Sequence, residues 1–142
     1  MIIGEYQQKV GEKKRVAVPV QFRKELKGKL YITRGYEHSL VVVDEQMWEK
    51  ITSQVVQGSM VNNSVRQTSR ILIGGAREIK PDAQGRFVLP DNLFEYAMIS
   101  SDIVWVGLVN WIELWNTQKW QEQLKYLETH GSKIADQLIV NK

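Results

Sequence analysis

Apolar and polar residues alternate near the start of the chain, and this alternation predicts the first strand. Over residues 5–10, Tyr6 and Val10 fall on the same side of an extended chain. A polar turn over residues 11–14 then leads into the short run 15–18, which is rich in apolar residues. Alternation with a period of two is typical of a half-buried strand. We therefore predict that residues 5–10 pair with residues 15–18 as a hairpin with a basic tip.

The next apolar positions predict a helix, a second hairpin and a second helix. Pro19 suits the first turn of a short helix in which Phe22 and Leu26, four residues apart, face the core. Two β-branched or aromatic runs, residues 30–32 and 40–43, predict the second hairpin. The helix that follows has Asp44 as its cap and one apolar stripe, formed by Met47, Trp48, Ile51 and Val55.

The same order of elements occurs twice. Residues 82–90 can be laid over residues 11–19 without a gap, because both contain a polar turn, an Arg, three apolar or small residues and a closing Pro. Residues 116–120 then correspond to 44–48 once one extra residue is allowed in the second copy. A repeat of this size cannot bury an adequate core alone, so the two copies are expected to form one structure.

The second copy predicts its own strand, helix, hairpin and helix, over residues 87–89, from Pro90, over 103–108 with 111–115, and from the Asn116 cap onward. Trp120 takes the place of Trp48, and we predict that both pack in the core rather than stack on bases. The predicted division of the chain is a first repeat at 1–56, a linker with a short helix at 57–75, a second repeat at 76–128, and a C-terminal tail with at most a weak helix at 129–142.

Charge is unevenly distributed. The chain has a net charge of +3, with 43% hydrophobic and 25% charged residues, which is ordinary for a globular protein. Residues 1–80 contain fourteen Lys or Arg against eight Asp or Glu, whereas residues 81–142 contain five against eight. A basic surface attracts polyanions. It is also compatible with a simple solvated face, so composition leaves both interpretations open.

Nothing in the residue pattern favours an enzyme. The chain has no cysteine and only two histidines, His38 and His130, which are far apart in sequence. Asp82 and Arg86 flank a tight turn, where a structural clasp is more common than a catalytic pair. No apolar run is long enough for a signal peptide or a membrane span. We therefore predict a soluble, cytoplasmic protein that is not an enzyme and uses no cofactor or metal.

Together these motifs resemble the MraZ family of bacterial regulators of the division and cell-wall gene cluster. The resemblance extends from Gly4 to about Leu127 and rests on the paired turns that end in Arg and are closed by Pro. Further matching residues are Gly4-Glu5-Tyr6, Phe22-Arg23, Thr33-Arg34-Gly35, Arg70, Gly75-Ala76 and Ile112-Glu113-Leu114-Trp115. The resemblance implies a mixed α+β, mainly β fold, in which two AbrB-like swapped hairpins interleave into a double-split small β-barrel with flanking helices.

The resemblance also implies a function and partners. Proteins of this family are expected to assemble into rings and to bind double-stranded DNA at short direct repeats in the promoter of their own operon. The expected partners are therefore DNA and further copies of the chain, with no membrane and no small-molecule ligand, and the expected location is the nucleoid. The residues expected to contact DNA are Arg15, Lys13, Lys14, Lys9, Arg23, Lys24 and Arg86.

The first turn departs from the family pattern of an Asp, three residues and an Arg, usually with a Gly before the Arg. Asp82, Gly85 and Arg86 keep this pattern, but Gly11 replaces the Asp and Lys14 replaces the Gly in the first copy. We expect that the arginine of the first turn thereby loses a local partner and binds phosphate more strongly. We also expect Gly11 to supply a positive φ.

Two alternatives stay open from the sequence. One is an antitoxin-type regulator of the same fold, which would add a partner-binding tail. The other is an oligomeric scaffold whose basic face is only solvated. The operator sequence, the ring size, the sign of regulation and any effector are not encoded in a recognisable motif.

Overall fold

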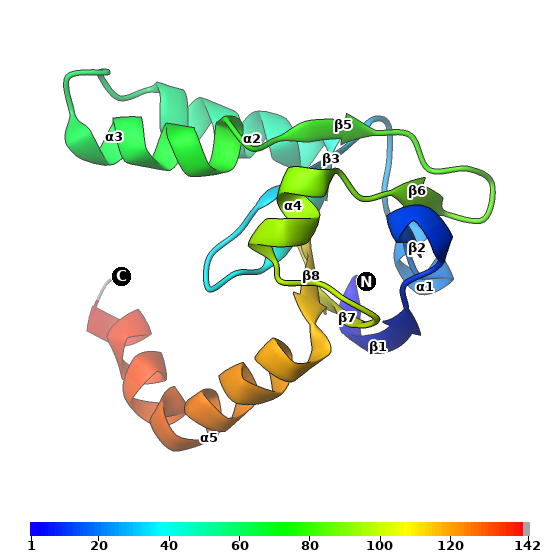
Figure 1. The fold of residues 1–142 in the computed structure, drawn as a ribbon. Helices are drawn as coiled ribbons and strands as arrows, with labels where there is room; N and C mark the ends of the chain where they lie inside the picture. The colour runs from blue at the N-terminus through cyan, green and yellow to red at the C-terminus, as the bar shows by residue number, and fades with distance from the viewer. Residues whose placement is uncertain (141–142) are drawn as a thin grey trace.

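The computed structural model describes residues 1–140 and has a mixed α+β architecture that is mainly sheet (Figure 1). The strands are β1 Ile3–Lys9, β2 Arg15–Ala17, β3 Leu30–Arg34, β4 Leu40–Asp44, β5 Arg77–Ile79, β6 Arg86–Val88, β7 Asp102–Leu108 and β8 Ile112–Asn116. The helices are α1 Val20–Arg23, α2 Glu45–Val56, α3 Asn63–Thr68, α4 Asp91–Tyr96 and α5 Thr117–Val140, with a 3-10 turn at Glu12–Lys14 and a π-helical turn at Ser69–Ile73.

Strand pairing crosses between the two copies, so the predicted hairpin of residues 5–10 with 15–18 is wrong. β1 pairs antiparallel with β7, from Ile3 opposite Leu108 to Lys9 opposite Asp102. β2 pairs antiparallel with β6 instead. The physical reason is partner length, since β7 offers β1 seven residues whereas β2 has only three. The hairpin of β3 with β4 forms as predicted.

The two copies are interleaved about a pseudo-two-fold axis. The six-stranded sheet has the order β1-β7-β8-β4-β3-β5, and the two-stranded sheet pairs β2 with β6. Val41 lies opposite Glu113 and Val16 lies opposite Phe87, and each pair joins positions that are equivalent in the repeat. β1 and β5 stand at the two ends of the six-stranded order, and the described strands do not close into a ring. Closure into a small barrel therefore stays a prediction.

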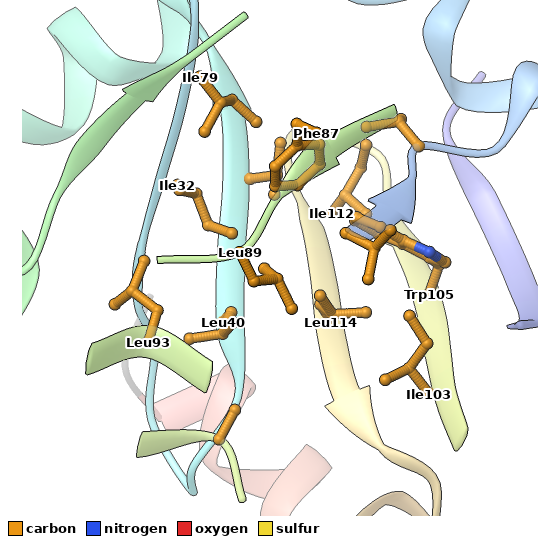
Figure 2. Close-up of a cluster of buried hydrophobic side chains, with 14 of the residues drawn as sticks. Ile32, Leu40, Ile79, Phe87, Leu89, Leu93, Ile103, Trp105, Ile112 and Leu114 are labelled. Atoms are coloured by element: carbon orange, nitrogen blue, oxygen red, sulfur yellow. The ribbon is translucent and has the colours of Figure 1, made fainter. Parts of the chain in front are cut away.

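One hydrophobic core fills the space between the six-stranded sheet, the β2/β6 ribbon and the short helices (Figure 2). Phe22 on α1 and Leu93 on α4 are fully buried, as predicted, but α1 ends at Arg23, so Leu26 lies beyond the helix and is only partly buried against the core. Figure 2 shows Ile32, Leu40, Leu89, Leu114 and Trp105 pointing into this common space. Burial of this apolar surface is the main force that holds the ribbon against the sheet.

The opposite face of the sheet carries both predicted tryptophans. Trp120 of α5 packs with Trp115, and its indole nitrogen donates to Glu5 at 2.7 Å. Trp48 of α2 stacks on Tyr31 with ring centroids 5.1 Å apart. Core packing is thus confirmed for Trp120, which belongs to a buried cluster, whereas Trp48 is only half-buried and packs on Tyr31 outside the buried clusters of the described residues.

Both predicted helix caps are present, and α5 is longer than expected. Asp44 accepts a hydrogen bond from the Met47 amide, and Asn116 accepts from the amides of Gln118 and Lys119. α5 continues through Gly131 to Val140, so residues 129–140 of the predicted tail form the second half of one helix, in which residues 132–138 are exposed. Residues 141–142 of that tail lie outside the described residues. In the described part of the chain, no helix is both long and apolar enough to cross a membrane.

Candidate nucleic-acid interface

The residues predicted to contact DNA are centred on the β2/β6 ribbon. Val16 and Phe87 point into the core, so the alternate residues of each strand face outward. Arg15 lies opposite Val88, and Ala17 lies opposite Arg86. Sheet geometry places such diagonal neighbours about 7–8 Å apart, so the two arginines of the repeat share one small face although 71 positions separate them in the printed sequence.

Side chains from the large sheet hold the ribbon in place. The Phe87 ring meets the edge of Trp105, with ring centroids 6.5 Å apart. The Gln8 side chain brackets Ala17, accepting from its amide at 2.9 Å and donating to its carbonyl at 2.9 Å. Because buried packing and paired hydrogen bonds both restrain it, the outer face of the ribbon is a preformed surface.

The second tip, residues 82–86, is closed by Asp82. The Asp82 carboxylate accepts from the amides of Gln84 and Arg86, each at 2.9 Å, and from Nε of Arg86 at 2.9 Å. The bond from the Arg86 amide is the largest cause that lowers the pKa of Asp82 below its usual value. The predicted clasp is therefore present in this copy. Gly85 has φ +81°, and a Cβ there would lie 2.7 Å from the Arg23 side chain, so glycine is needed.

The first tip, residues 11–15, has the same outline but a different backbone solution. Gly11 has φ −81°, so the expectation that it supplies a positive φ is wrong. Lys13 and Lys14 instead have φ 59°. The reason is that Gly11 already closes the turn by donating its amide to the Arg15 carbonyl at 2.8 Å in an extended conformation.

The basic residues of the first tip differ in their partners. Lys14 forms an ion pair with Asp91 of α4 at 2.6 Å and lies 5.0 Å above the Phe94 ring. Its hydrogen bond lowers the pKa of Asp91. Arg15 makes no ion pair with any of the described residues, which agrees with the predicted loss of a local partner. Lys14 is therefore tied to the second copy, while Arg15 is exposed.

Two shallow hollows flank the ribbon, and both are lined by Arg15 and Arg86. One, of about 370 Å³, also contains Lys9. The other, of about 460 Å³, also contains Arg77 and Lys80. Sequence reasoning missed Arg77 and Lys80, but the repeat overlay could have found Lys80, because it is the counterpart of Lys9.

The remaining predicted residues lie around this centre. Lys9 forms an ion pair with Asp102 at 3.0 Å, and its hydrogen bond lowers the pKa of that carboxyl group. Arg23 donates to the Ala83 carbonyl at 3.4 Å, which places it beside the second tip. Lys13 and Lys24 are exposed. The structure therefore places Lys9, Lys13, Lys14, Arg15, Arg23 and Arg86 on or beside the ribbon and its tips. Lys24 follows Arg23 at the end of α1, and no contact among the described residues joins it to the ribbon.

The part of the chain that the structure describes contains both histidines, His38 and His130, and a number of Asp and Glu side chains. Within it, no three His, Cys, Asp or Glu side chains come together as a possible metal site. His38 contacts the Tyr96 carbonyl at 3.0 Å and packs against the Tyr96 ring. The chemistry that the ribbon face does offer is two guanidinium groups, several ammonium groups and one exposed valine.

Comparison with known proteins matches this arrangement to one family. The model of the family described as "MraZ protein, putative antitoxin-like" matches the chain twice, over residues 1–71 and 72–141. A protein of Roseiflexus castenholzii named "Transcriptional regulator MraZ" is 33% identical over 138 residues, covering 97% of this chain and 96% of its own length. One of the same name from Halothermothrix orenii is 36% identical over 135 residues, covering 95% and 94%. The two matched halves and the near-complete coverage establish that the chain belongs to the MraZ family.

Proposed function

We propose that this protein is a transcriptional regulator that binds double-stranded DNA with the outer face of the β2/β6 ribbon and its two tips. The observation that carries the proposal is the pair of exposed arginines, Arg15 and Arg86, on one preformed face at the pseudo-two-fold axis. Relatives named as transcriptional regulators support the same function.

The shape of the ribbon fits this role. The major groove of B-DNA accepts a two-stranded β-ribbon, and arginine and lysine supply most contacts to phosphate. We propose that Lys9, Lys13, Arg23, Lys24 and Lys80 contact the DNA backbone around the ribbon. Lys9 and Lys80 line its two hollows, and Arg23 lies beside the second tip. Two of the predicted lysines already have a carboxylate partner: the ammonium group of Lys14 binds Asp91, and that of Lys9 binds Asp102.

Assembly is the second part of the proposal. About six phosphate contacts from one chain correspond to weak, non-specific binding at physiological salt. Several ribbons held at fixed spacing bind far more tightly, and neighbours in a ring are related head to tail, which favours direct repeats. We therefore propose that a homo-oligomeric ring acts on direct repeats in the promoter of its own division and cell-wall gene cluster, at the nucleoid in the cytoplasm.

Fluorescence anisotropy with labelled duplex DNA at two salt concentrations tests the binding surface. Arg15→Ala should weaken binding and reduce the slope of log affinity against log salt by about one, because one phosphate contact is lost. Lys133→Ala is the matched control, since Lys133 is an exposed cation in the second half of α5. Equal effects of the two changes would contradict the proposed surface. Absence of any salt-dependent binding would favour the scaffold alternative.

Light scattering and titration with DNA carrying one, two or three copies of the repeat test the assembly. The protein should elute well above its chain mass of 16.5 kDa and bind three copies more tightly than one. A monodisperse monomer that binds one copy as tightly as three would exclude the ring mechanism.

The antitoxin-type regulator remains the second candidate because the matched family description contains that word. The exposed second half of α5 is the segment that such a regulator would use for a partner. Removal of residues 131–142 should leave DNA binding intact under either function, so loss of a regulatory effect in cells without loss of DNA binding would favour this candidate.

A further inference from the structure

The two arginines of the ribbon face, Arg15 and Arg86, differ in how firmly neighbouring groups hold their side chains. Asp82 binds Nε of Arg86 at 2.9 Å and also accepts the Arg86 amide, so the side chain and its backbone are fixed to the same carboxylate. Both terminal nitrogens of Arg86 remain available, because neither makes a hydrogen bond to the described residues. Arg15 is exposed and forms no ion pair or side-chain hydrogen bond with the described residues, so its side chain is not held in this way.

These restraints suit different ligands. A guanidinium whose plane is already set presents its fork in one orientation, and guanine O6 and N7 form the matching pair of acceptors in the major groove. Side-chain freedom that is lost before binding no longer opposes the contact. Phosphate can be approached from many directions, so a mobile arginine meets it equally well.

Val88 is the other unusual residue on this face. It is 51% exposed, it follows Arg86 by two positions on the same side of β6, and it lies opposite Arg15. Its counterpart Ala17 is smaller and is bracketed by Gln8. An exposed apolar side chain between two arginines has one natural partner in the major groove, the C5-methyl group of thymine.

We propose that Arg86 and Val88 read the base sequence, through guanine O6/N7 and the thymine methyl respectively, whereas Arg15 and the surrounding cations hold phosphate. The inference rests on the proposed DNA-binding function and adds to it a division of labour within the ribbon. Asp82 is then a positioning residue that orients Arg86 without touching DNA.

The test starts with in vitro selection of duplexes from a random library by the full-length protein. Discrimination is then the ratio of the Kd for a scrambled duplex to the Kd for the selected duplex. Arg86→Lys keeps the charge but removes the fork, and it should lower discrimination roughly 5- to 150-fold, the range for one bidentate contact. Arg15→Lys is the matched control and should largely preserve discrimination. Thermal unfolding of each variant verifies that it is folded.

Two further variants test the mechanism. Asp82→Asn should bind scrambled DNA more tightly, because one negative charge is gone, yet discriminate less, because Arg86 is no longer held. Replacing single thymines of the selected DNA with uracil should lower the affinity of the wild-type protein at one or more positions. At those positions the same replacement should not lower the affinity of the Val88→Ala variant any further, because the methyl contact is already lost. In the same way, replacing the contacted guanine with 7-deazaguanine, which lacks the N7 acceptor, should lower the affinity of the wild-type protein more than that of the Arg86→Lys variant.

Each contrary outcome has a defined meaning. If Arg86→Lys leaves discrimination unchanged, or Arg15→Lys lowers it more, the division of labour is wrong while DNA binding stands. If Val88→Ala responds to uracil as the wild type does, Val88 is not a base reader. If the wild-type protein shows no salt-dependent DNA binding and selects no sequence, the proposed function itself fails.

Discussion

The first and second tips have the same main-chain hydrogen bonds but different side chains. In the first tip the Gly11 amide donates to Arg15 at 2.8 Å, and in the second the Asp82 amide donates to Arg86 at 3.0 Å. The ribbon is extended beyond both tips by equivalent bonds, from Val18 to Gly85 and from Leu89 to Lys14, each at 2.9 Å. The repeat thus preserves main-chain hydrogen bonding while the side chains diverge.

The two tips place a cation on different elements: the first tip has Lys14 in its turn, whereas the second tip has Arg23 of the neighbouring helix α1. Lys14 lies over Phe94 in the first tip, whereas Gly85 lies under Arg23 at the corresponding place in the second. Spatial neighbours therefore have to be included in any count of charge. With Asp91 included, the first tip has three cations and two carboxylates; with Arg23 included, the second has two cations and one carboxylate. Each has a net charge of +1, so the tips differ in freedom rather than in charge.

The largest contrast between the copies is expected on the opposite face of the sheet. Trp120→Ala should lower the free energy of unfolding by about 3–5 kcal/mol, because it empties a buried site and leaves Glu5 without its indole donor. Trp48→Ala should cost less, on the order of 2 kcal/mol, because the ring is half-buried and stacks on Tyr31. Chemical denaturation measures both, and equal losses would mean that the two helices are held equally.

An intermediate effect on stability is expected from substitutions at Gly85 and Lys14, the equivalent positions of the two tips. Gly85→Ala should destabilise the protein by about 1–3 kcal/mol, because φ is positive and the new Cβ would meet Arg23 and the Val18 carbonyl. Lys14→Gly should be close to neutral, since relief of a left-handed lysine offsets the loss of an exposed ion pair worth about 0–1 kcal/mol. Urea denaturation compares them. A Lys14→Gly loss as large as that of Gly85→Ala would show that the first tip depends on Asp91.

The smallest effect is a pH dependence that separates the tips. The pKa of Asp82 is lowered mainly by the Arg86 amide, and that of Asp91 by Lys14. A carboxyl group whose pKa is lower in the folded state contributes stability above its unfolded pKa, about 3.9, and loses it as pH falls through the folded value. Stability should therefore fall below about pH 4. Asp82→Asn should flatten this fall, and Lys14→Met should remove only the part due to Asp91, as measured by unfolding at pH 7 and pH 3. Identical pH profiles for both variants and the wild type would contradict these assignments.

Local features were predictable from the sequence, whereas strand partners were not. The caps at Asp44 and Asn116 and the inward Phe22 and Leu93 follow from spacing of one or two helical turns. Alternation identifies the buried face of a strand but is silent about its neighbour, which is why the predicted hairpin failed while the implied interleaving was found. The repeat overlay was the only signal that connected residues far apart in sequence.

The candidate site shows the same limit. Its arginines were found because the repeat marks them, but the contact between Lys14 and Asp91 joins residues of different copies and has no local signature. The restraint on Arg86 was visible as a motif, whereas Val88 looks like any other strand residue until pairing places it on the outer face. Partner identity, and therefore availability of a cation, depends on tertiary packing.

The interleaved sheet also has a consequence during synthesis. Ile3 on β1 has its partner Leu108 on β7, about a hundred residues later in the chain. At about 5–20 residues per second, β1 is synthesised some 5–20 s before that partner. Until β7 has been made, β1 has no β7 to pair with and could pair with another nascent chain. β1 contains the polar residues Glu5, Gln7 and Lys9, and charged and polar residues on an unpaired strand discourage pairing with other chains. The sequence of β1 therefore limits aggregation before β7 is made, and it also fits the finished sheet.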